Sequence, residues 1–114
     1  MAKVYKIVAR ADWDAAVRAG VFQGAAIDLR DGYIHLSTAA QAPETARLHF
    51  AGQVGLVLLR IDAAALGAAL TWEPSRGGAL FPHLYGPLDC NLVEVVTEIE
   101  LDQSGIPQLG VLIP

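Results

Sequence analysis

Two short segments of this sequence carry the same set of chemically active side chains. Residues 33–37 read Tyr-Ile-His-Leu-Ser, and residues 81–85 read Phe-Pro-His-Leu-Tyr. Because side chains alternate between the two faces of a strand, each segment places an aromatic ring, a histidine and a hydroxyl on one face. The side chains that share these faces are Tyr33, His35, Ser37, Phe81, His83 and Tyr85.

Either histidine alone has a structural explanation, because a single histidine in a strand is more often a core residue than a catalyst. The repeated pattern changes this interpretation, since a core histidine does not require a hydroxyl two residues later on the same face. Taken together, the two segments favour a site.

A third segment, Thr71-Trp72-Glu73, adds a carboxylate. The same alternation places Thr71 and Glu73 on one face and Trp72, which we expect to be a core anchor, on the other. If the three segments line one cleft, it has the aromatic walls and few convergent polar groups of a small-molecule site. We then expect Glu73 to lie within hydrogen-bond reach of a histidine or Tyr85.

Two other reactive side chains, His49 and Cys90, are expected to be structural. His49 falls in the last turn of a predicted helix, where an imidazolium balances the helix dipole. Cys90 is the only cysteine, which excludes an intramolecular disulfide and a paired-cysteine zinc motif. No cation near Cys90 in the sequence would lower the pKa of its thiol.

The first half of the chain must position the first histidine. The elements predicted there are a strand over Val4–Ala9, a helix over Trp13–Ala19 between an Asp12 cap and Gly20, a loop over Val21–Gly32, a strand over Tyr33–Ser37 and a helix from Thr38 to about Phe50. Thr38 and Gln41 have the spacing of a capping box, which opens the second helix.

The second half is rich in strands. The predicted elements are strands over Val54–Ile61, Ala69–Glu73, Leu80–Tyr85 and Leu92–Asp102, a helical turn over Asp62–Leu66 and an edge strand over Leu109–Ile113. In Leu92–Asp102 apolar and acidic residues alternate, so the acidic residues are expected on a solvated face. We predict one α+β domain over residues 1–114, with two N-terminal helices against a strongly bent, largely antiparallel sheet.

The number and distribution of charged residues limit the kinds of partner that the chain can bind. The chain of 114 residues has 8 Lys and Arg against 12 Asp and Glu, and none of the 8 lies after Arg76. A protein that binds nucleic acid needs a basic stripe, so a nucleic-acid partner is not expected. One or two arginines are enough to hold a small anion.

The sequence also suggests where the protein acts. Its first ten residues lack the continuous apolar stretch of a signal peptide, and no apolar run is long enough to cross a membrane. With a single thiol, these features predict a cytoplasmic protein without membrane contact, as a monomer or weak dimer.

The motifs DGYIHLSTAAQ and LTWEPSRGGALFPHLYGPL, with an early Asp12-Trp13, resemble the bacterial domain-of-unknown-function family 952. The resemblance runs from Val4 to about Thr97. The positions that correspond to its signature are His35, Ser37, Gln41, Trp72, Glu73, Phe81, His83, Tyr85 and Gly86. Many members have a histidine after the first-strand tyrosine, where this chain has Lys6.

This resemblance implies an ADP-ribosyltransferase-like fold, a split antiparallel sheet around a nicotinamide dinucleotide cleft. NAD would then be a substrate and not a resident cofactor, and the reaction would be ADP-ribosyl transfer or NAD glycohydrolysis. The implied catalytic residues are His35, Glu73, His83 and Tyr85, and the implied ligand-binding residues are Tyr33, Ser37, Gln41, Arg76 and Phe81, with no metal ligand. In such a site a tyrosine stacks on nicotinamide, Glu73 orients the attacking hydroxyl and Arg76 meets phosphate.

Two alternatives remain open. The chain has no Glu-x-Glu pair and is short for a substrate-recognition insertion, so a non-catalytic nucleotide-binding or interaction module agrees almost as well. The third candidate is a metal enzyme in which His35, His83 and Glu73 form a facial triad for a divalent ion.

Overall fold

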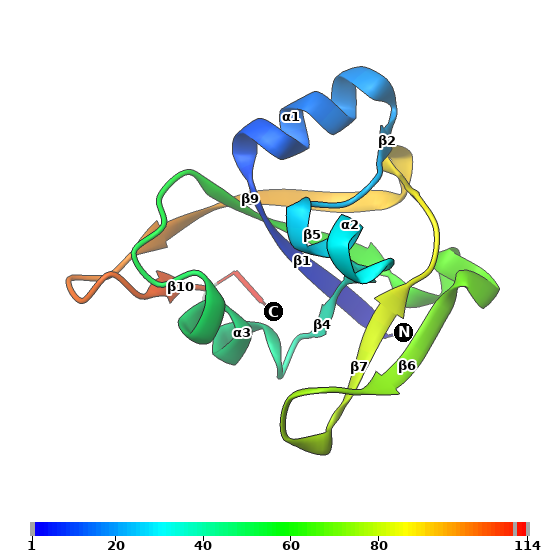
Figure 1. Ribbon diagram of the computed structural model, residues 1–114. Helices are drawn as coiled ribbons and strands as arrows, with labels where there is room; N and C mark the ends of the chain where they lie inside the picture. The colour runs from blue at the N-terminus through cyan, green and yellow to red at the C-terminus, as the bar shows by residue number, and fades with distance from the viewer. Residues whose placement is uncertain (1, 111, 114) are drawn as a thin grey trace.

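The first of two antiparallel sheets is the scaffold of the molecule. In the computed structural model, which describes residues 2–110, 112 and 113, its five strands follow the order β10-β9-β5-β1-β4 (Figure 1). Their bounds are β1 Lys3–Ala9, β4 Ser37–Thr38, β5 Leu56–Asp62, β9 Val93–Leu101 and β10 Pro107–Gln108. β1 and β5 are almost continuously apolar and buried, as strands covered on both faces must be.

The second sheet carries the aromatic and histidine motifs. It has the order β3-β7-β6, where β3 is Ile34–His35, β6 is Leu70–Pro74 and β7 is Leu80–Leu84. A separate pair joins β2, Val21–Phe22, to β8, Leu88–Asp89. All strand pairs among the described residues are antiparallel.

Residues 34–38 join the two sheets. β3 pairs with β7 in the small sheet, while β4, which follows after one residue, pairs with β1 in the large sheet. The residue between them is Leu36, which is buried and donates its backbone N–H to the carbonyl of Pro82 at 3.1 Å. The predicted strand Tyr33–Ser37 is therefore broken at Leu36, because its two halves have different partners.

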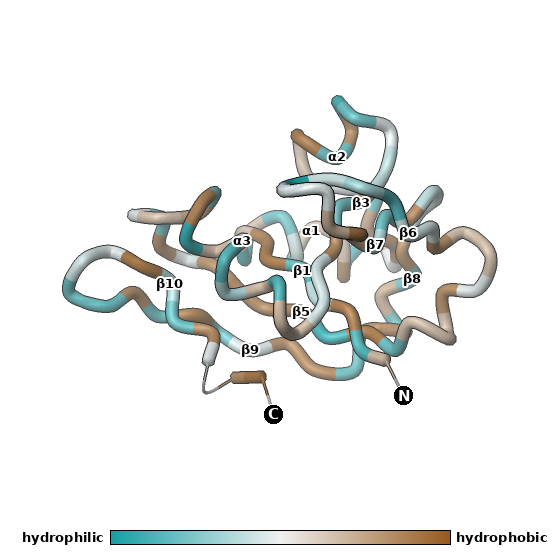
Figure 2. Tube along the Cα trace, turned by 90° about the horizontal axis from the view of Figure 1, so that it is seen from below, coloured by the Kyte–Doolittle hydropathy of each residue, from teal (hydrophilic) through white to brown (hydrophobic). Residues whose placement is uncertain are grey.

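Two helices cover opposite faces of the large sheet. α1, Arg10–Ala19, packs Trp13 and Ala16 against the Val4 and Val8 face of β1. α3, Ala42–His49, packs Ala42 and Ala46 against the opposite face. The result is two apolar cores with β1 and β5 between them, and hydrophobic residues run along β5 while hydrophilic ones dominate the turn between β9 and β10 (Figure 2).

A third helix corrects the loop predicted over Val21–Gly32. That segment contains β2 and the short helix α2, Ala26–Asp31, which ends at Gly32 with φ 87°. Asp28 stabilises the start of α2 by accepting the backbone N–H of Ala25 at 2.8 Å. Helices this short depend on such contacts more than on their intrinsic propensity, which is why the sequence alone did not indicate α2.

The ends of the other elements agree only partly with the sequence. α1 has Ala9 at its N-cap without a side-chain cap, so the predicted Asp12 cap is wrong, whereas Gly20 ends the helix in the left-handed region at φ 84°. Thr38 and Gln41 form both bonds of the predicted capping box, at 3.0 and 3.1 Å, although α3 begins only at Ala42.

Near the C-terminus the predicted edge strand is displaced. β10 is Pro107–Gln108 and pairs with the end of β9, while the described residues of the predicted Leu109–Ile113 are not a strand. Val111 lies outside the described residues. Along β9 the glutamates are exposed as predicted, but Val95 and Val96 are exposed too, and the pairing register with β5 shifts beside Val95.

Short 3₁₀ turns complete the chain. They are Ala63–Ala69, Arg76–Gly78 and Cys90–Leu92. The first agrees with the helical turn predicted near Asp62, whose carboxylate accepts the backbone N–H of Ala64.

Candidate functional site

The pairing of β3 with β7 brings the two predicted histidines together. His35 lies directly opposite His83 in the register, and their ring centroids are 5.8 Å apart. Both rings line a cavity of about 240 Å³ between the two sheets. The other polar and aromatic side chains of the lining are those of Tyr5, Lys6, Ser37, Thr45, His49, Phe50, Ser75, Arg76 and Phe81.

A carboxylate holds one nitrogen of His83. Nδ1 of His83 lies 2.7 Å from Oε1 of Glu73, and the Tyr85 hydroxyl donates to the same oxygen at 2.7 Å. The hydrogen bonds from Tyr85 and His83 lower the pKa of Glu73, and the bond to Glu73 raises the pKa of Tyr85 to about 12. Because the ionised carboxylate only accepts, Nδ1 carries the proton and Nε2 of a neutral His83 is an acceptor.

The expected contact of Glu73 with a histidine and Tyr85 is thus present, but Glu73 itself does not line the cavity. Its hydrogen bonds make it a poor base, because they favour its charged form. Glu73 therefore orients His83 and does not itself reach a bound molecule in the cavity.

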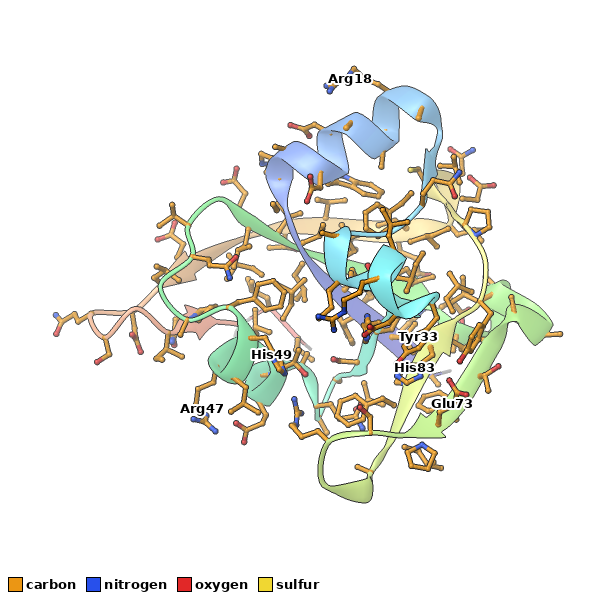
Figure 3. All side chains as sticks on the ribbon, in the orientation of Figure 1. Arg18, Tyr33, Arg47, His49, Glu73 and His83 are labelled. Atoms are coloured by element: carbon orange, nitrogen blue, oxygen red, sulfur yellow. The ribbon has the colours of Figure 1, made fainter. Side chains whose placement is uncertain are left out.

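Aromatic stacking fixes the other side of this cluster. The ring of Tyr33 stacks on that of His83 with centroids 4.1 Å apart, and lies 4.6 Å from His35 and 5.3 Å from Tyr85. Figure 3 shows Tyr33, His83 and Glu73 gathered on one side of the molecule. Tyr33 contacts both histidine rings and Tyr85 bonds to Glu73, and neither tyrosine lines the cavity. Their contribution is therefore to position the histidines, Tyr85 through Glu73.

His35 lies between two carboxylates that the sequence analysis did not single out. Its Nδ1 is 2.6 Å from Oδ1 of Asp28, and its Nε2 is 3.0 Å from Oδ2 of Asp31. Both acids belong to α2, where a spacing of three residues places them on the same side. An imidazole can donate to both carboxylates at once only in its imidazolium form. The signal in the sequence was this Asp-x-x-Asp spacing just before a turn glycine.

Asp28 is the centre of a buried charge network. Lys6 Nζ lies 3.0 Å from its Oδ1 and 2.9 Å from its Oδ2, and the backbone N–H of His35 donates to Oδ1 at 3.0 Å. Burial would raise the pKa of Asp28, but the hydrogen bond from His35 and the charge of Lys6 outweigh it and lower the pKa to about 2. Burial lowers the pKa of Lys6, against the charge of Asp28.

This network gives Lys6, the residue after Tyr5 in β1, a structural role. Its ammonium neutralises a carboxylate that is almost inaccessible to solvent. Buried charges are tolerated only when paired and hydrogen-bonded in this way. Lys6 therefore supports the wall of the cavity that holds His35.

Another part of the cavity wall combines an arginine with two hydroxyls. Arg76 Nη1 donates to Thr45 Oγ1 at 3.2 Å, and its guanidinium lies 4.8 Å from the ring centroid of Phe81. The Ser37 hydroxyl is 3.1 Å from that of Thr45. Thr45 was not predicted as a site residue, because a threonine within a helix carries no sequence signal of its own.

One predicted ligand-binding residue is placed elsewhere. Gln41 does not line the cavity; its Nε2 donates to the carbonyl of Leu80 at 2.8 Å while its Oε1 caps Thr38. It ties the start of α3 to β7. The structure thus places Gln41 outside the cavity lining, because Thr38 and Leu80 already occupy both ends of its amide.

Two further features of the described residues concern metal binding and membrane insertion. No group of three or more His, Cys, Asp or Glu side chains in residues 2–110, 112 and 113 is arranged to hold a metal ion. The facial triad thus lacks geometric support there, since Glu73 bonds to His83 instead of facing the cavity beside it. Within the same residues, no helix has the length and apolar character needed to cross a bilayer.

Solved structures of a bacterial protein share this architecture. A crystal structure of protein CC0527 from Caulobacter crescentus is 53% identical to the chain, covers 97% of each chain and has a TM-score of 0.96. The crystal structure of a double mutant of CC0527 is 52% identical to the chain, the match covers 97% of each chain, and the TM-score is 0.95. The solution NMR structure of CC0527 is 54% identical to the chain and has a TM-score of 0.87. The match covers 96% of this chain and 95% of CC0527.

No curated protein matches the chain at a significant level. A family model does match, and it covers residues 7–96, which include β3, β6, β7 and both histidines. With this match over most of its length, the chain belongs to the family described as "Protein of unknown function (DUF952)".

Proposed function

We propose that the cavity between the two sheets binds a nucleotide-like small molecule, with NAD or an ADP-ribose derivative as the first candidates. The observation that carries this proposal is the cross-strand pair His35 and His83 on the cavity wall, with Glu73 on Nδ1 of His83. A histidine anchored by a carboxylate at one nitrogen presents the other nitrogen for proton transfer or hydrogen bonding.

The division of the sheet supports the same ligand class. A cavity between a large and a small antiparallel sheet is the arrangement expected of an ADP-ribosyltransferase-like fold, which binds a nicotinamide dinucleotide. At about 240 Å³ the cavity is slightly smaller than the ~300–1,000 Å³ of typical ligand pockets. It would therefore enclose the ribose and its leaving group, while the rest of a dinucleotide stays outside.

The reaction that such a site would support is cleavage of the nicotinamide–ribose bond. Nicotinamide leaves with the bonding electron pair, and the oxygen of water or an acceptor hydroxyl forms the new bond to the anomeric carbon. Nε2 of His83 accepts the proton of that oxygen, and Glu73 stabilises the resulting imidazolium through Nδ1. Water as acceptor gives NAD glycohydrolysis, and a hydroxyl gives ADP-ribosyl transfer.

A non-catalytic nucleotide-binding module is the second candidate. Both ring nitrogens of His35 face carboxylate oxygens, so His35 has no free nitrogen to exchange a proton with a ligand. Of the cross-strand pair, only His83 then has a free ring nitrogen for acid–base chemistry. One such nitrogen is enough to bind a ligand, and whether the protein also turns it over has to be measured.

Calorimetric titration with NAD and with ADP-ribose tests the proposal. We expect saturable binding that weakens at least tenfold in His83→Gln, because the substitution removes the imidazole and its bond to Glu73. Trp72→Phe is the matched control, since Trp72 lies on the opposite face of β6 and is exposed; its affinity should equal that of the wild type. Released nicotinamide, measured on the same samples, separates the enzyme from the binding module.

The proposal is wrong if neither ligand binds at millimolar concentration, or if His83→Gln binds as tightly as the wild type. Melting temperatures of both variants show whether a loss of binding reflects a loss of fold.

A further inference from the structure

One cation on the cavity wall is not compensated by an acid. Lys6 is paired with Asp28, and His35 and His83 each contact at least one carboxylate, whereas His49, a third histidine of the lining, forms no such contact among the described residues. Arg76, in contrast, forms no ion pair with any described residue; its one polar partner is the Thr45 hydroxyl. In a chain with a net charge of −4, this leaves a local positive charge on the cavity wall.

The guanidinium of Arg76 is held in place before any ligand arrives. It lies over the ring of Phe81, and one of its N–H groups is used on Thr45. The turn that carries it is closed by two backbone bonds of 2.9 Å, Ser75 N–H to Ala79 and Gly78 N–H to Ser75. Arginine has five N–H donors in a planar fork, so four remain for an acceptor.

Two hydroxyls beside Arg76 supply a further donor. Ser37 is buried, and its Oγ lies 3.1 Å from Oγ1 of Thr45, which also accepts from Arg76. The two hydroxyls carry two protons, and the bond between them uses one. The second proton is therefore available to a group in the cavity, whichever hydroxyl donates to the other.

We propose that Arg76, Thr45 and Ser37 form a phosphate subsite on the wall of the cavity. A phosphoryl group has enough oxygens to accept from the arginine fork and from a hydroxyl at the same time. The inference deepens the proposed function and rests on it for the orientation of the ligand. The phosphate next to the ribose binds at Arg76, and the glycosidic bond is then directed to the histidine pair.

This orientation of the ligand indicates a class of substrate. The small cavity selects a phosphorylated riboside, either as a mononucleotide or as one half of a dinucleotide. Ribose 5-phosphate is the smallest probe that contains both recognised parts, and inorganic phosphate contains the charged part alone.

Calorimetric titration with inorganic phosphate and with ribose 5-phosphate tests the subsite. We expect Arg76→Gln to weaken both affinities at least tenfold, and Thr45→Val to weaken them by a smaller factor. Arg47→Gln is the matched control, because Arg47 is an exposed arginine of the same region that pairs with Glu44 and does not line the cavity. Figure 3 shows Arg47 pointing away from the molecule.

The outcomes separate this inference from the proposed function. Phosphate binding that is unchanged in Arg76→Gln and Thr45→Val overturns the subsite, whatever the nucleotide results. Phosphate binding that depends on Arg76 supports the subsite, even if NAD and ADP-ribose do not bind and the proposed function fails. Arg47→Gln should retain wild-type affinity for inorganic phosphate; a tenfold loss there would contradict the assignment of phosphate to Arg76.

Discussion

The two histidines of the cavity differ in what their ring nitrogens contact. Nδ1 of His83 is bound to Glu73, while its Nε2 has no hydrogen-bond partner among the described residues. Both nitrogens of His35 lie against carboxylates of α2. His83 therefore has a free nitrogen that can accept a proton, while both nitrogens of His35 are held in a fixed position. The same residue type has two roles because the neighbouring acids differ.

The buried ion pair of Lys6 and Asp28 leads to a prediction about the stability of the protein. Lys6→Met would leave the carboxylate of Asp28 buried without its ammonium, and breaking one partner of a buried pair costs about 3–5 kcal/mol. Lys3→Met is the matched control, since Lys3 is on the same strand and forms a partly exposed pair with Glu94, which is worth at most ~1 kcal/mol. Urea unfolding of the two variants measures the difference.

A loss of stability for Lys6→Met no larger than that for Lys3→Met would show that Asp28 does not need Lys6. In that case the bonds from His35 and Ala25 would be sufficient to hold the buried carboxylate.

The sequence predicted those side-chain contacts that depend on the alternation of residues along a strand. The meeting of His35, His83 and Glu73 followed from side chains two residues apart on paired strands. Asp28 was missed because it acts across three elements, on β1 through Lys6 and on β3 through His35. Such a contact depends on tertiary packing, which no local pattern contains.

The element that most affects the site is α2, only six residues long. It supplies both carboxylates around His35 and ends at Gly32, just before the strand that carries this histidine. The left-handed backbone at Gly32 turns the chain from the helix into β3, so that the end of α2 faces the ring.

Substituting Gly32 tests whether the surroundings of His35 depend on how α2 ends. Gly32→Ala should cost about 1–2 kcal/mol because an L-residue is strained in the left-handed region. Gly20→Ala, at the end of α1, is the matched control: its φ is nearly the same, and a Cβ meets no atom within 4 Å at either position. We expect equal losses of stability, measured by urea unfolding, but changed histidine NMR resonances of His35 only in Gly32→Ala.

If Gly20→Ala alters the His35 resonances as much as Gly32→Ala does, the effect is a general one and α2 has no particular role in holding that ring.

Long apolar strands were the elements easiest to predict. β1 and β5 appeared at nearly the expected positions because strands buried on both faces have continuous apolar sequences. The break at Leu36 was not predicted, because a strand that changes sheets keeps its alternation and looks continuous in sequence. That break places His35 in one sheet and Ser37 in the other, on either side of the cavity.

For the molecule as a whole, the split of the sheet determines the function we propose. α1 and α3 cover opposite faces of the large sheet, and the small sheet joins it through residues 34–38. The order of the predicted helices and strands indicated an α+β domain with a bent antiparallel sheet, which is what the structure has. It could not locate the cavity, because the positions of α2 and of the β6–β7 hairpin depend on contacts between distant segments.

The central claim is that the cavity beside His83 binds a nucleotide-like ligand, and histidine NMR measures it most directly. Protein labelled with ¹⁵N and ¹³C in its histidines is titrated with ADP-ribose while the Nε2 resonance of His83 is followed. We expect this resonance to shift and saturate with the affinity found by calorimetry, since Nε2 is the nitrogen that Glu73 does not hold. A His83 resonance that stays unchanged up to millimolar ADP-ribose would contradict the claim.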